Sequence, residues 1–220
     1  MDKEEFLRLV EEEGYAPGWD AIDAAFEKLY PGQEPDHFVT KLTERAVSGG
    51  DEYLDGYSVY TSPKGYKHIV TYGMTFLYGE EEAFGGEWNG WGYEMTIKLK
   101  EAETKNCMWA MQVLSNLARY TYESDKYFEP YHFAEGNGSP LHTGTDSKIT
   151  ALMAVYDTEA ETQTSVCGKT EFIQFVGITE EELQMLIEDP SKARALADAM
   201  KADGNPDLVT DMKRTKSYIV

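Results

Sequence analysis

The sequence predicts a single α+β domain over residues 1–220. Residues 90–100 alternate apolar and polar side chains, as a strand with two different faces does. Helical and strand patterns follow one another without the strict strand–helix–strand repeat of a parallel α/β sheet. The chain has no internal repeat, low-complexity linker or change in composition, and its 220 residues suit one large domain.

The first part of the chain contains two helical and three strand patterns. Residues 2–13 are acidic and amphipathic, and we expect an N-terminal helix within residues 1–14. Residues 17–30 predict a second helix, because Pro17 suits a first turn and apolar residues recur at helical spacing. Strands are expected near 37–43, 55–62 and 67–77, with Pro63-Lys64-Gly65 as a turn and Gly49-Gly50-Asp51 as a loop.

Residues 90–100 give the clearest local signal. Gly90 and Gly92 flank Trp91 and permit a turn or bulge that brings the backbone close to the indole. The strand that follows is predicted to have one apolar face and one solvent-facing face. The apolar face holds Tyr93, Met95, Ile97 and Leu99, and the solvent-facing one holds Glu94, Thr96, Lys98 and Lys100.

The second part begins with a predicted helix over residues 107–124. Residues 125–147 are irregular and contain the aromatic residues Tyr127, Phe128, Tyr131 and Phe133. Thr179-Glu180-Glu181-Glu182 forms a capping box that begins a helix ending near residue 188. Further strands are expected over 148–156, 170–178 and 208–212, with a short helix over 191–202.

The chain is strongly acidic, with 40 Asp and Glu against 20 Lys and Arg and a formal net charge of -20. This excess repels nucleic-acid phosphate, so no nucleic-acid partner is expected. It favours either a basic protein partner or solubility alone. Acids cluster at Glu11–Glu13, Glu80–Glu82 and Glu180–Glu182; the last run suits a helix start, whereas Glu80–Glu82 lie in a predicted loop.

The compartment follows from features that the sequence lacks. Two cysteines, Cys107 and Cys167, do not make a disulfide framework. The acidic N-terminus is not a secretory signal, and no apolar run approaches the ~20 residues of a membrane span. We expect a cytoplasmic protein that does not bind membranes.

The sequence predicts no metal site, no cofactor and no enzyme. Its four histidines are not spaced as metal ligands. Gly168-Lys169-Thr170 resembles the end of a phosphate-binding loop, but Gln163 replaces the required glycine and a strand follows instead of a helix. The alternative is a hydrolase that uses Asp or Glu with His132 or His142, since these histidines lie in the aromatic and acidic 125–147 segment.

Residues 78–91 form the most suggestive candidate surface for binding a protein. Trp and Tyr bury much area at low entropy cost, which suits an interface. The same aromatic residues also suit the role of plugging the end of the sheet, and both interpretations stay open. The candidates are Tyr78, Glu80, Glu81, Glu82, Trp88 and Trp91.

Short motifs in a fixed order carry a family resemblance. They are Tyr30-Pro31-Gly32-Gln33, Phe76-Leu77-Tyr78-Gly79, Gly90-Trp91-Gly92-Tyr93-Glu94, Leu117-Ala118-Arg119-Tyr120, Phe172–Gly177 followed by Thr179–Leu183, and Val209–Arg214. Together they resemble the Suppressor of fused (SUFU) domain family over about residues 17–216. The resemblance implies a mixed, largely antiparallel sheet packed by helices.

The resemblance also implies a binding function. Animal members look non-catalytic and grip a peptide of a transcription factor as an added strand between two halves. Tyr78 matches a family tyrosine used in that grip, and Glu87 is the nearest candidate for the adjoining loop acid. The chain ends where the first half of the animal proteins would end, so we expect it to lack the second half.

Single-domain bacterial relatives look like immunity proteins of polymorphic toxin systems. We therefore expect a non-enzymatic module that sequesters a toxin, and an acidic inhibitor would be steered electrostatically to a basic toxin. The alternative is a regulator that sequesters a transcription factor or another cellular protein, by analogy with the animal members. The oligomeric state is left open.

Overall fold

The structure is a computed structural model that describes residues 1–11, 14–40 and 54–220. The strands are β1 (Asp36–Val39), β2 (Gly56–Thr61), β3 (Lys67–Tyr72), β4 (Trp88–Leu99), β5 (Phe133–Ala134), β6 (Ile149–Tyr156), β7 (Gln163–Ser165) and β8 (Gly168–Thr179). The α-helices are α1 (Lys3–Val10), α2 (Pro17–Leu29), α4 (Met108–Ser124), α5 (Glu180–Glu188) and α6 (Ala193–Ala202). The short 3-10 helices are η1 (Glu81–Ala83), η2 (Thr104–Cys107) and η3 (Pro190–Lys192).

One eight-stranded sheet organises the described residues. Its order is β1-β2-β3-β4-β8-β6-β5, and β7 pairs with β8 outside this path. The strand pairings are antiparallel apart from that of β4 with β8, which is parallel. The predicted α+β class with a mixed, largely antiparallel sheet is confirmed.

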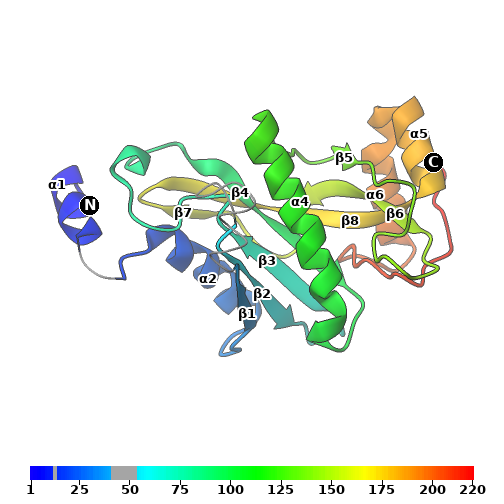
Figure 1. The fold of residues 1–220 in the computed structure, drawn as a ribbon, viewed down its shortest axis with the longest axis horizontal. Helices are drawn as coiled ribbons and strands as arrows, with labels where there is room; N and C mark the ends of the chain where they lie inside the picture. The colour runs from blue at the N-terminus through cyan, green and yellow to red at the C-terminus, as the bar shows by residue number, and fades with distance from the viewer. Residues whose placement is uncertain (12–13, 41–53) are drawn as a thin grey trace.

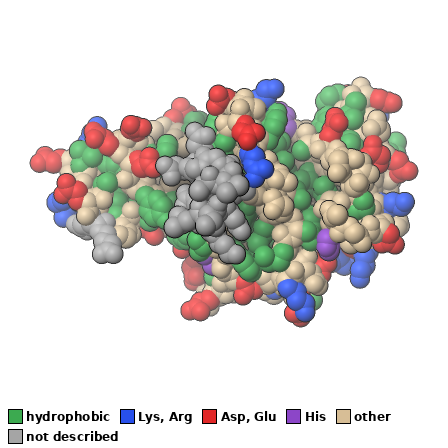
Figure 2. Space-filling view, in the orientation of Figure 1, with side chains coloured by type: hydrophobic (Ala, Val, Ile, Leu, Met, Phe, Trp, Pro, Cys, Tyr) green, Lys and Arg blue, Asp and Glu red, His purple; other side chains and the backbone are tan. Residues whose placement is uncertain are grey.

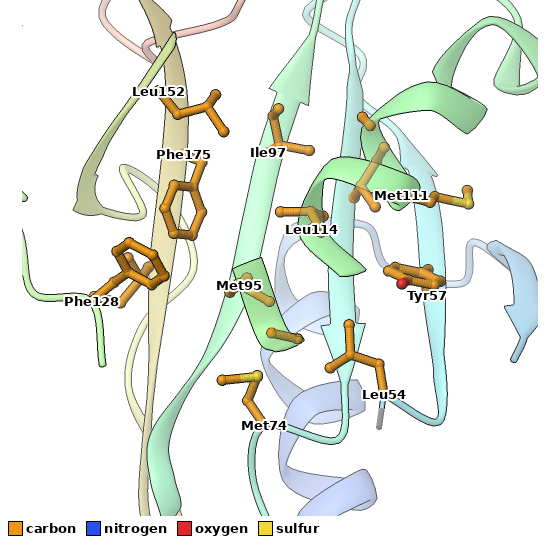
Figure 3. Close-up of a cluster of buried hydrophobic side chains, with 14 of the residues drawn as sticks. Leu54, Tyr57, Met74, Met95, Ile97, Met111, Leu114, Phe128, Leu152 and Phe175 are labelled. Carbon is orange, nitrogen blue, oxygen red and sulfur yellow. The ribbon is translucent and has the colours of Figure 1, made fainter. Parts of the chain in front are cut away.

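Helices cover both faces of this sheet (Figure 1). α4 crosses one face, where its apolar side packs on alternate residues of β3, β4, β6 and β8. Figure 3 shows Leu114 of α4 beside Met95 and Ile97 of β4, with Met111 of α4 on the side of Tyr57 of β2. α2 covers the opposite face beside β2 and β3, and α5 and α6 cover that same face beside β6 and β8.

The predicted solvent-facing side of β4 is wrong for three of its four residues. Glu94, Thr96 and Lys98 are fully buried, and only Lys100 is exposed. The reason is that the turn at residues 73–75 covers Glu94, residues 157 and 158 cover Thr96 and Lys98, and Thr210 bonds to the backbone of Lys98. Alternation in a sequence separates two faces, but it does not say what packs on each of them.

Two strand predictions are corrected in length. The strand expected over 67–77 ends at Tyr72, because the N–H groups of residues 73–75 donate to the Glu94 carboxylate instead of a neighbouring strand. The strand expected over 208–212 is a single bridge between Thr210 and Leu99. The short strands β5 and β7 were not predicted, since neither is long enough to show alternation.

The helix predictions are confirmed. α2 and α4 follow the expected ranges, and α5 begins with the predicted capping box of Thr179 and Glu182. α1 is the predicted N-terminal helix. Three predicted stretches lie outside the described residues: the helix end at 12–13, the strand end at 41–43 and the loop at 49–51. No helix in the described part of the chain is long and apolar enough to cross a membrane.

Candidate functional site

A groove of about 490 Å³ opens on the α4 face of the sheet, beyond the C-terminal end of α4. One wall is the start of β4, and the other is the segment 127–130. The C-terminal end of β6 and the first part of β8 form the floor. We call it the aromatic groove. It is lined by Trp88, Gly90, Trp91, Gly92, Tyr93, Tyr127, Phe128, Glu129, Pro130, Tyr156, Glu171 and Ile173.

A bulge in β4 creates the first wall. Trp88 pairs with Lys169 of β8, but the next pair is Tyr93 with Glu171, so residues 89–92 lie opposite the single residue 170. The surplus chain arches out of the ladder, as expected of a bulge. Gly92 permits this path, since its φ of +83° is rarely adopted by other residues and a Cβ there would lie 3.2 Å from the Trp88 ring.

The bulge is held in place from the side of the sheet. The Asn89 side chain is buried and pairs with Phe76 twice, accepting from its N–H and donating to its carbonyl, each at 3.1 Å. The Trp91 N–H donates to the carbonyl of Met74 at 3.1 Å. The residues after β3 therefore fix the backbone position of both Trp88 and Trp91.

That turn is itself fixed by a buried carboxylate, Glu94. Its two oxygens accept hydrogen bonds from Thr71, Gly73, Met74 and Thr75, through three backbone N–H groups and two hydroxyls. Burial raises the pKa of Glu94 to about 7, although these hydrogen bonds oppose the shift. A polar residue in the core thus positions the groove above it.

The second wall is anchored at both ends. The Phe128 N–H donates to the Tyr93 hydroxyl at 3.2 Å, and the Phe128 ring packs edge-on against Phe175 with centroids 5.2 Å apart. The Tyr131 N–H donates to the carbonyl of Ala154 on β6 at 2.7 Å. Both walls therefore belong to the framework of the sheet, so the groove is formed before any partner arrives.

Large aromatic rings border the groove and remain open to solvent. Trp88 is 46% exposed, Tyr127 54% and Tyr156 57%. Trp91 is half-buried, packs on the main core and meets Tyr122 edge-on with centroids 6.1 Å apart. Trp91 therefore both closes the core and faces the groove, so the two interpretations of its sequence position are compatible.

The structure separates the sequence-predicted residues into two groups. Trp88 and Trp91 line the aromatic groove, whereas Tyr78 and Glu80–Glu82 lie toward α1 and are absent from the described lining. Tyr78 is 51% exposed, and Glu81 forms an ion pair with Lys3 of α1 at 2.9 Å. In Figure 2 acidic side chains gather on the left lobe, where Figure 1 places α1.

Glu87 lies between these groups. Its side chain is exposed, and its carbonyl accepts a hydrogen bond from the Lys169 N–H at 3.1 Å. It precedes Trp88 directly, so it stands at the edge of the groove without being part of the described lining.

Sequence reasoning missed Tyr156, Glu129 and Glu171 as groove residues. The last residue of β6, Tyr156, points to the α4 face because it alternates in step with Leu152 and Ala154. An exposed tyrosine at the end of an apolar strand was the available signal. No local pattern in the sequence predicts that Tyr156 and Trp88 line the same groove, because β6 and β4 both pair with β8 and not with each other.

His132 and His142, the basis of the hydrolase alternative, have separate neighbours. His132 accepts from the Glu129 N–H at 3.1 Å, whereas His142 stacks on Trp109 with centroids 5.4 Å apart. The His, Cys, Asp and Glu residues in the described ranges form no group of three or more that could hold a metal ion. The structure therefore does not assemble these histidines into one site.

A different histidine has partners that resemble a catalytic relay. His68 contacts the Tyr30 hydroxyl through Nδ1 at 2.8 Å and Asp157 through Nε2 at 2.9 Å. The side chains of His68 and Asp157 are both fully buried. A substrate cannot reach them in this structure, so we interpret the arrangement as a structural link.

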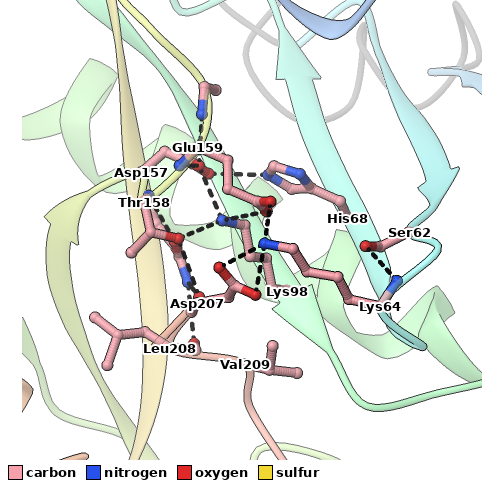
Figure 4. A network of polar contacts seen from close by, with 12 residues as sticks. Ser62, Lys64, His68, Lys98, Asp157, Thr158, Glu159, Asp207, Leu208 and Val209 are labelled. Atoms are coloured by element: carbon pink, nitrogen blue, oxygen red, sulfur yellow. Dashed lines mark hydrogen bonds and ion pairs between the residues drawn. The ribbon is translucent and has the colours of Figure 1, made fainter. Parts of the chain in front are cut away.

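The same carboxylate belongs to a larger ion cluster (Figure 4). Lys98 lies 3.0 Å from Asp157 and 3.1 Å from Glu159, and Lys64 joins Glu159 to Asp207 at 2.7 and 3.0 Å. Burial alone would raise the pKa of Asp157, but the charges of His68 and Lys98 hold it well below its usual range. This cluster ties residues 157–159 and 207 to the middle of the sheet.

The comparisons with known proteins agree on one family. The model described as "Suppressor of fused protein (SUFU)" matches residues 50–215 of the chain. The human protein named "Suppressor of fused homolog" is 27% identical over 213 residues, which cover 90% of this chain and 43% of the human protein. The chain thus spans less than half the length of that curated relative.

Solved structures show the same fold. A chain from the Sufu-Fu complex crystal structure has a TM-score of 0.78 at 23% identity, and the match covers 92% of this chain and 93% of that one. A SUFU homolog from Neisseria gonorrhoeae FA 1090 has a TM-score of 0.62 at 13% identity, with 92% and 98% covered. At such identities the likeness concerns the fold alone.

Proposed function

The chain belongs to the Suppressor of fused protein (SUFU) family, and we propose that it is a non-catalytic, single-domain module of the bacterial type that sequesters one basic protein. The most specific form of this proposal is an immunity protein that holds a toxin in the cytoplasm. Members of the family are typically non-catalytic binding proteins. We further propose that residues 1–220 act as one domain.

The observation that carries the proposal is the aromatic groove. Trp88, Tyr127 and Tyr156 expose about half of their surface around one preformed concavity. Exposed rings of this kind supply large contact area with little loss of side-chain freedom, which is typical of binding hot spots. A solvent-facing cluster of three such rings costs solubility unless a partner covers it.

Two further findings support a protein partner of positive charge. One relative was solved as part of a Sufu-Fu complex, so a protein with this fold does bind another protein. The net charge of -20 would speed encounter with a basic partner and slow encounter with an acidic one. The solved chain of the N. gonorrhoeae homolog, 98% of which this chain covers, is similar to it in extent.

We propose that the surface beside α1 makes a second contact with the same partner. Tyr78 and the run Glu80–Glu82 are exposed there, and Glu87 is exposed between this surface and the groove. Trp88 and Trp91 on the groove side complete the set. Tight inhibitors commonly combine an apolar anchor with charges at the rim, since the charges raise the association rate and the anchor slows dissociation.

A regulator of a cellular protein is the second candidate, and the Sufu-Fu complex favours it. The two candidates differ in what the partner does when it is free. A toxin arrests growth of its host when expressed alone, and its immunity protein restores growth. A regulated cellular protein shows neither effect.

The proposed function can be tested by affinity capture with the tagged chain from its source cell at low and high salt. We expect one stoichiometric partner with basic composition, whose recovery falls at high salt. Expression of that partner alone should arrest growth, and co-expression of this chain should restore it. A stoichiometric partner without toxicity would support the regulator instead, and no stoichiometric partner at either salt would contradict both.

A further inference from the structure

The aromatic groove is acidic as well as aromatic. Glu129 and Glu171 both line it, with Tyr156 on the same floor. The charge of Glu171 is the main cause that raises the pKa of the Tyr156 hydroxyl, followed by burial and by Glu129. Burial raises the pKa of Glu171 itself, although Lys169 opposes this. The carboxylates of Glu171 and Glu129 therefore make the electrostatic potential around Tyr156 negative.

The end of α4 adds to this negative potential. The helix stops at Asp125, which takes a left-handed conformation, and its last turn contains no basic residue. The last carbonyl groups of a helix carry the negative end of its dipole. Tyr127, two residues after this end, is part of the groove lining.

Two cations near the groove contact its residues from outside the described lining, which contains no lysine, arginine or histidine. Lys169 lies over the Trp88 ring at 5.4 Å from its centroid, outside the described lining. His132 Nε2 lies 3.5 Å from Glu129, whose side chain remains 59% exposed. Neither residue places a positive charge between Glu129 and Glu171 in the described lining.

We propose that the groove receives a lysine or arginine side chain from a basic segment of the partner. The inference rests on the proposed function and names the chemistry of its contact. The rings of Tyr127 and Tyr156 would attract the cation through their faces, and Trp88 would help to cover the aliphatic stem. Glu129 and Glu171 would accept hydrogen bonds from its charged end.

An apolar side chain fits this groove less well for an electrostatic reason. It would remove water from both carboxylates without supplying a counter-charge, and desolvating an unpaired charge is costly. A cationic side chain supplies that charge. The volume of about 490 Å³ is within the range of ligand pockets, so the groove has room for a single long side chain.

The four tryptophans provide the readout for a direct test. The probe is a short blocked peptide of alternating glycine and arginine, and its control replaces each arginine with neutral citrulline. We expect the indole N–H signals of Trp88 and Trp91 to shift saturably with the arginine peptide. Trp109, which stacks on His142, should not shift. The citrulline peptide should bind at least about tenfold more weakly.

Two double variants distinguish the effect of the groove carboxylates from the effect of the protein's net charge. Glu129→Gln with Glu171→Gln should weaken arginine-peptide binding at least about tenfold at fixed ionic strength. Glu188→Gln with Asp198→Asn removes the same charge from exposed positions on α5 and α6, and should change binding less than about twofold. Both double variants should unfold in urea like the wild type.

The inference is overturned if both double variants weaken binding equally, or if citrulline binds as well as arginine. It is also overturned if only Trp19 shifts, because Trp19 borders a separate acidic pocket with Asp20, Asp23 and Glu27. The proposed function would survive any of these results, provided that affinity capture still yields its basic partner. If affinity capture yields no partner but the arginine peptide still binds, the proposed function is rejected. The preference of the groove for a cation then still holds.

Discussion

Glu94 and Thr75 are joined twice: the same carboxylate oxygen accepts the backbone N–H of Thr75 at 3.0 Å and its hydroxyl at 2.8 Å. This pair fixes the turn after β3. A hydrogen bond from Trp91 to that turn then holds the bulge in β4. The buried Glu94 is therefore linked to the aromatic groove through Met74, whose N–H donates to Glu94 and whose carbonyl accepts from Trp91. The predictions below follow this chain of support from the core outward.

Removing the Glu94 carboxylate should destabilise the fold strongly. Glu94→Ala leaves the N–H groups of residues 73–75, of which those of Met74 and Thr75 are buried, without their acceptor. We expect the free energy of unfolding to fall by about 3 kcal/mol or more, measured by urea denaturation. A loss below about 1 kcal/mol would show that water replaces the carboxylate and that Glu94 does not hold the turn.

Stability should also depend on pH through Glu94. Its pKa is raised to about 7 in the folded protein, against about 4.3 in an unfolded chain. Between these values the folded state keeps a proton that the unfolded state releases. The contribution of Glu94 to the free energy of unfolding should therefore be largest below about pH 4.3, fall by about 3–4 kcal/mol as the pH rises to about 7, and level off above it.

Glu94→Gln isolates this contribution, because the amide does not titrate. The difference in stability between wild type and this variant should change over the stated pH range. A difference that stays constant from about pH 4 to pH 8 would mean that the folded and unfolded states bind the same number of protons at Glu94.

Lys98 of the buried ion cluster has a matched control in Lys100, which lies just beyond the end of β4. Lys98→Met leaves Asp157 buried without its lysine, and we expect a loss of about 3–5 kcal/mol in unfolding free energy. Lys100→Met, two residues along, removes an exposed partner of Asp211 and should cost less than about 0.5 kcal/mol. Equal effects of the two substitutions would argue that the cluster contributes nothing beyond a surface pair.

Gly92 should matter for binding as well as for stability. Gly92→Ala forces an unfavourable φ, at about 1–2 kcal/mol, and brings a methyl group against the Trp88 ring. Gly138→Ala has a similar φ of +76° in open space, so it carries the strain without touching a groove residue. We expect similar unfolding curves for the two variants, with partner binding weakened only by Gly92→Ala. Equal partner affinities would mean that the position of Trp88 is unimportant.

The sequence predicts the fold better than it predicts the site, and β4 shows why. Alternation correctly placed Tyr93, Met95 and Ile97 on one face, since the period of a strand is local. It misplaced Glu94 and Lys98, because Glu94 is buried against residues 71–75 and Lys98 against residues 157–159, neither of which a strand's own period records. Polar residues in a strand look the same in sequence whether they face water or a buried network.

The site was predictable only in part for the same reason. Glycines around Trp91 indicated a bulge, and the bulge is present. The groove, however, combines this bulge with Tyr127, Tyr156 and Glu171, which come from three other segments. Their meeting depends on the parallel pairing of β4 with β8, a long-range contact that no local pattern in the sequence records.

The central claim, that the aromatic groove binds a basic partner, is tested most directly by calorimetric titration of the captured partner. The wild type is compared with Trp88→Ala/Tyr127→Ala and with Met108→Ala, an exposed apolar control at the other end of α4, about 24 Å away. We predict that the groove variant loses at least about a hundredfold in affinity, while the control binds like the wild type. Wild-type affinity in the groove variant would contradict the account and would direct attention to Tyr78 and Glu80–Glu82 instead.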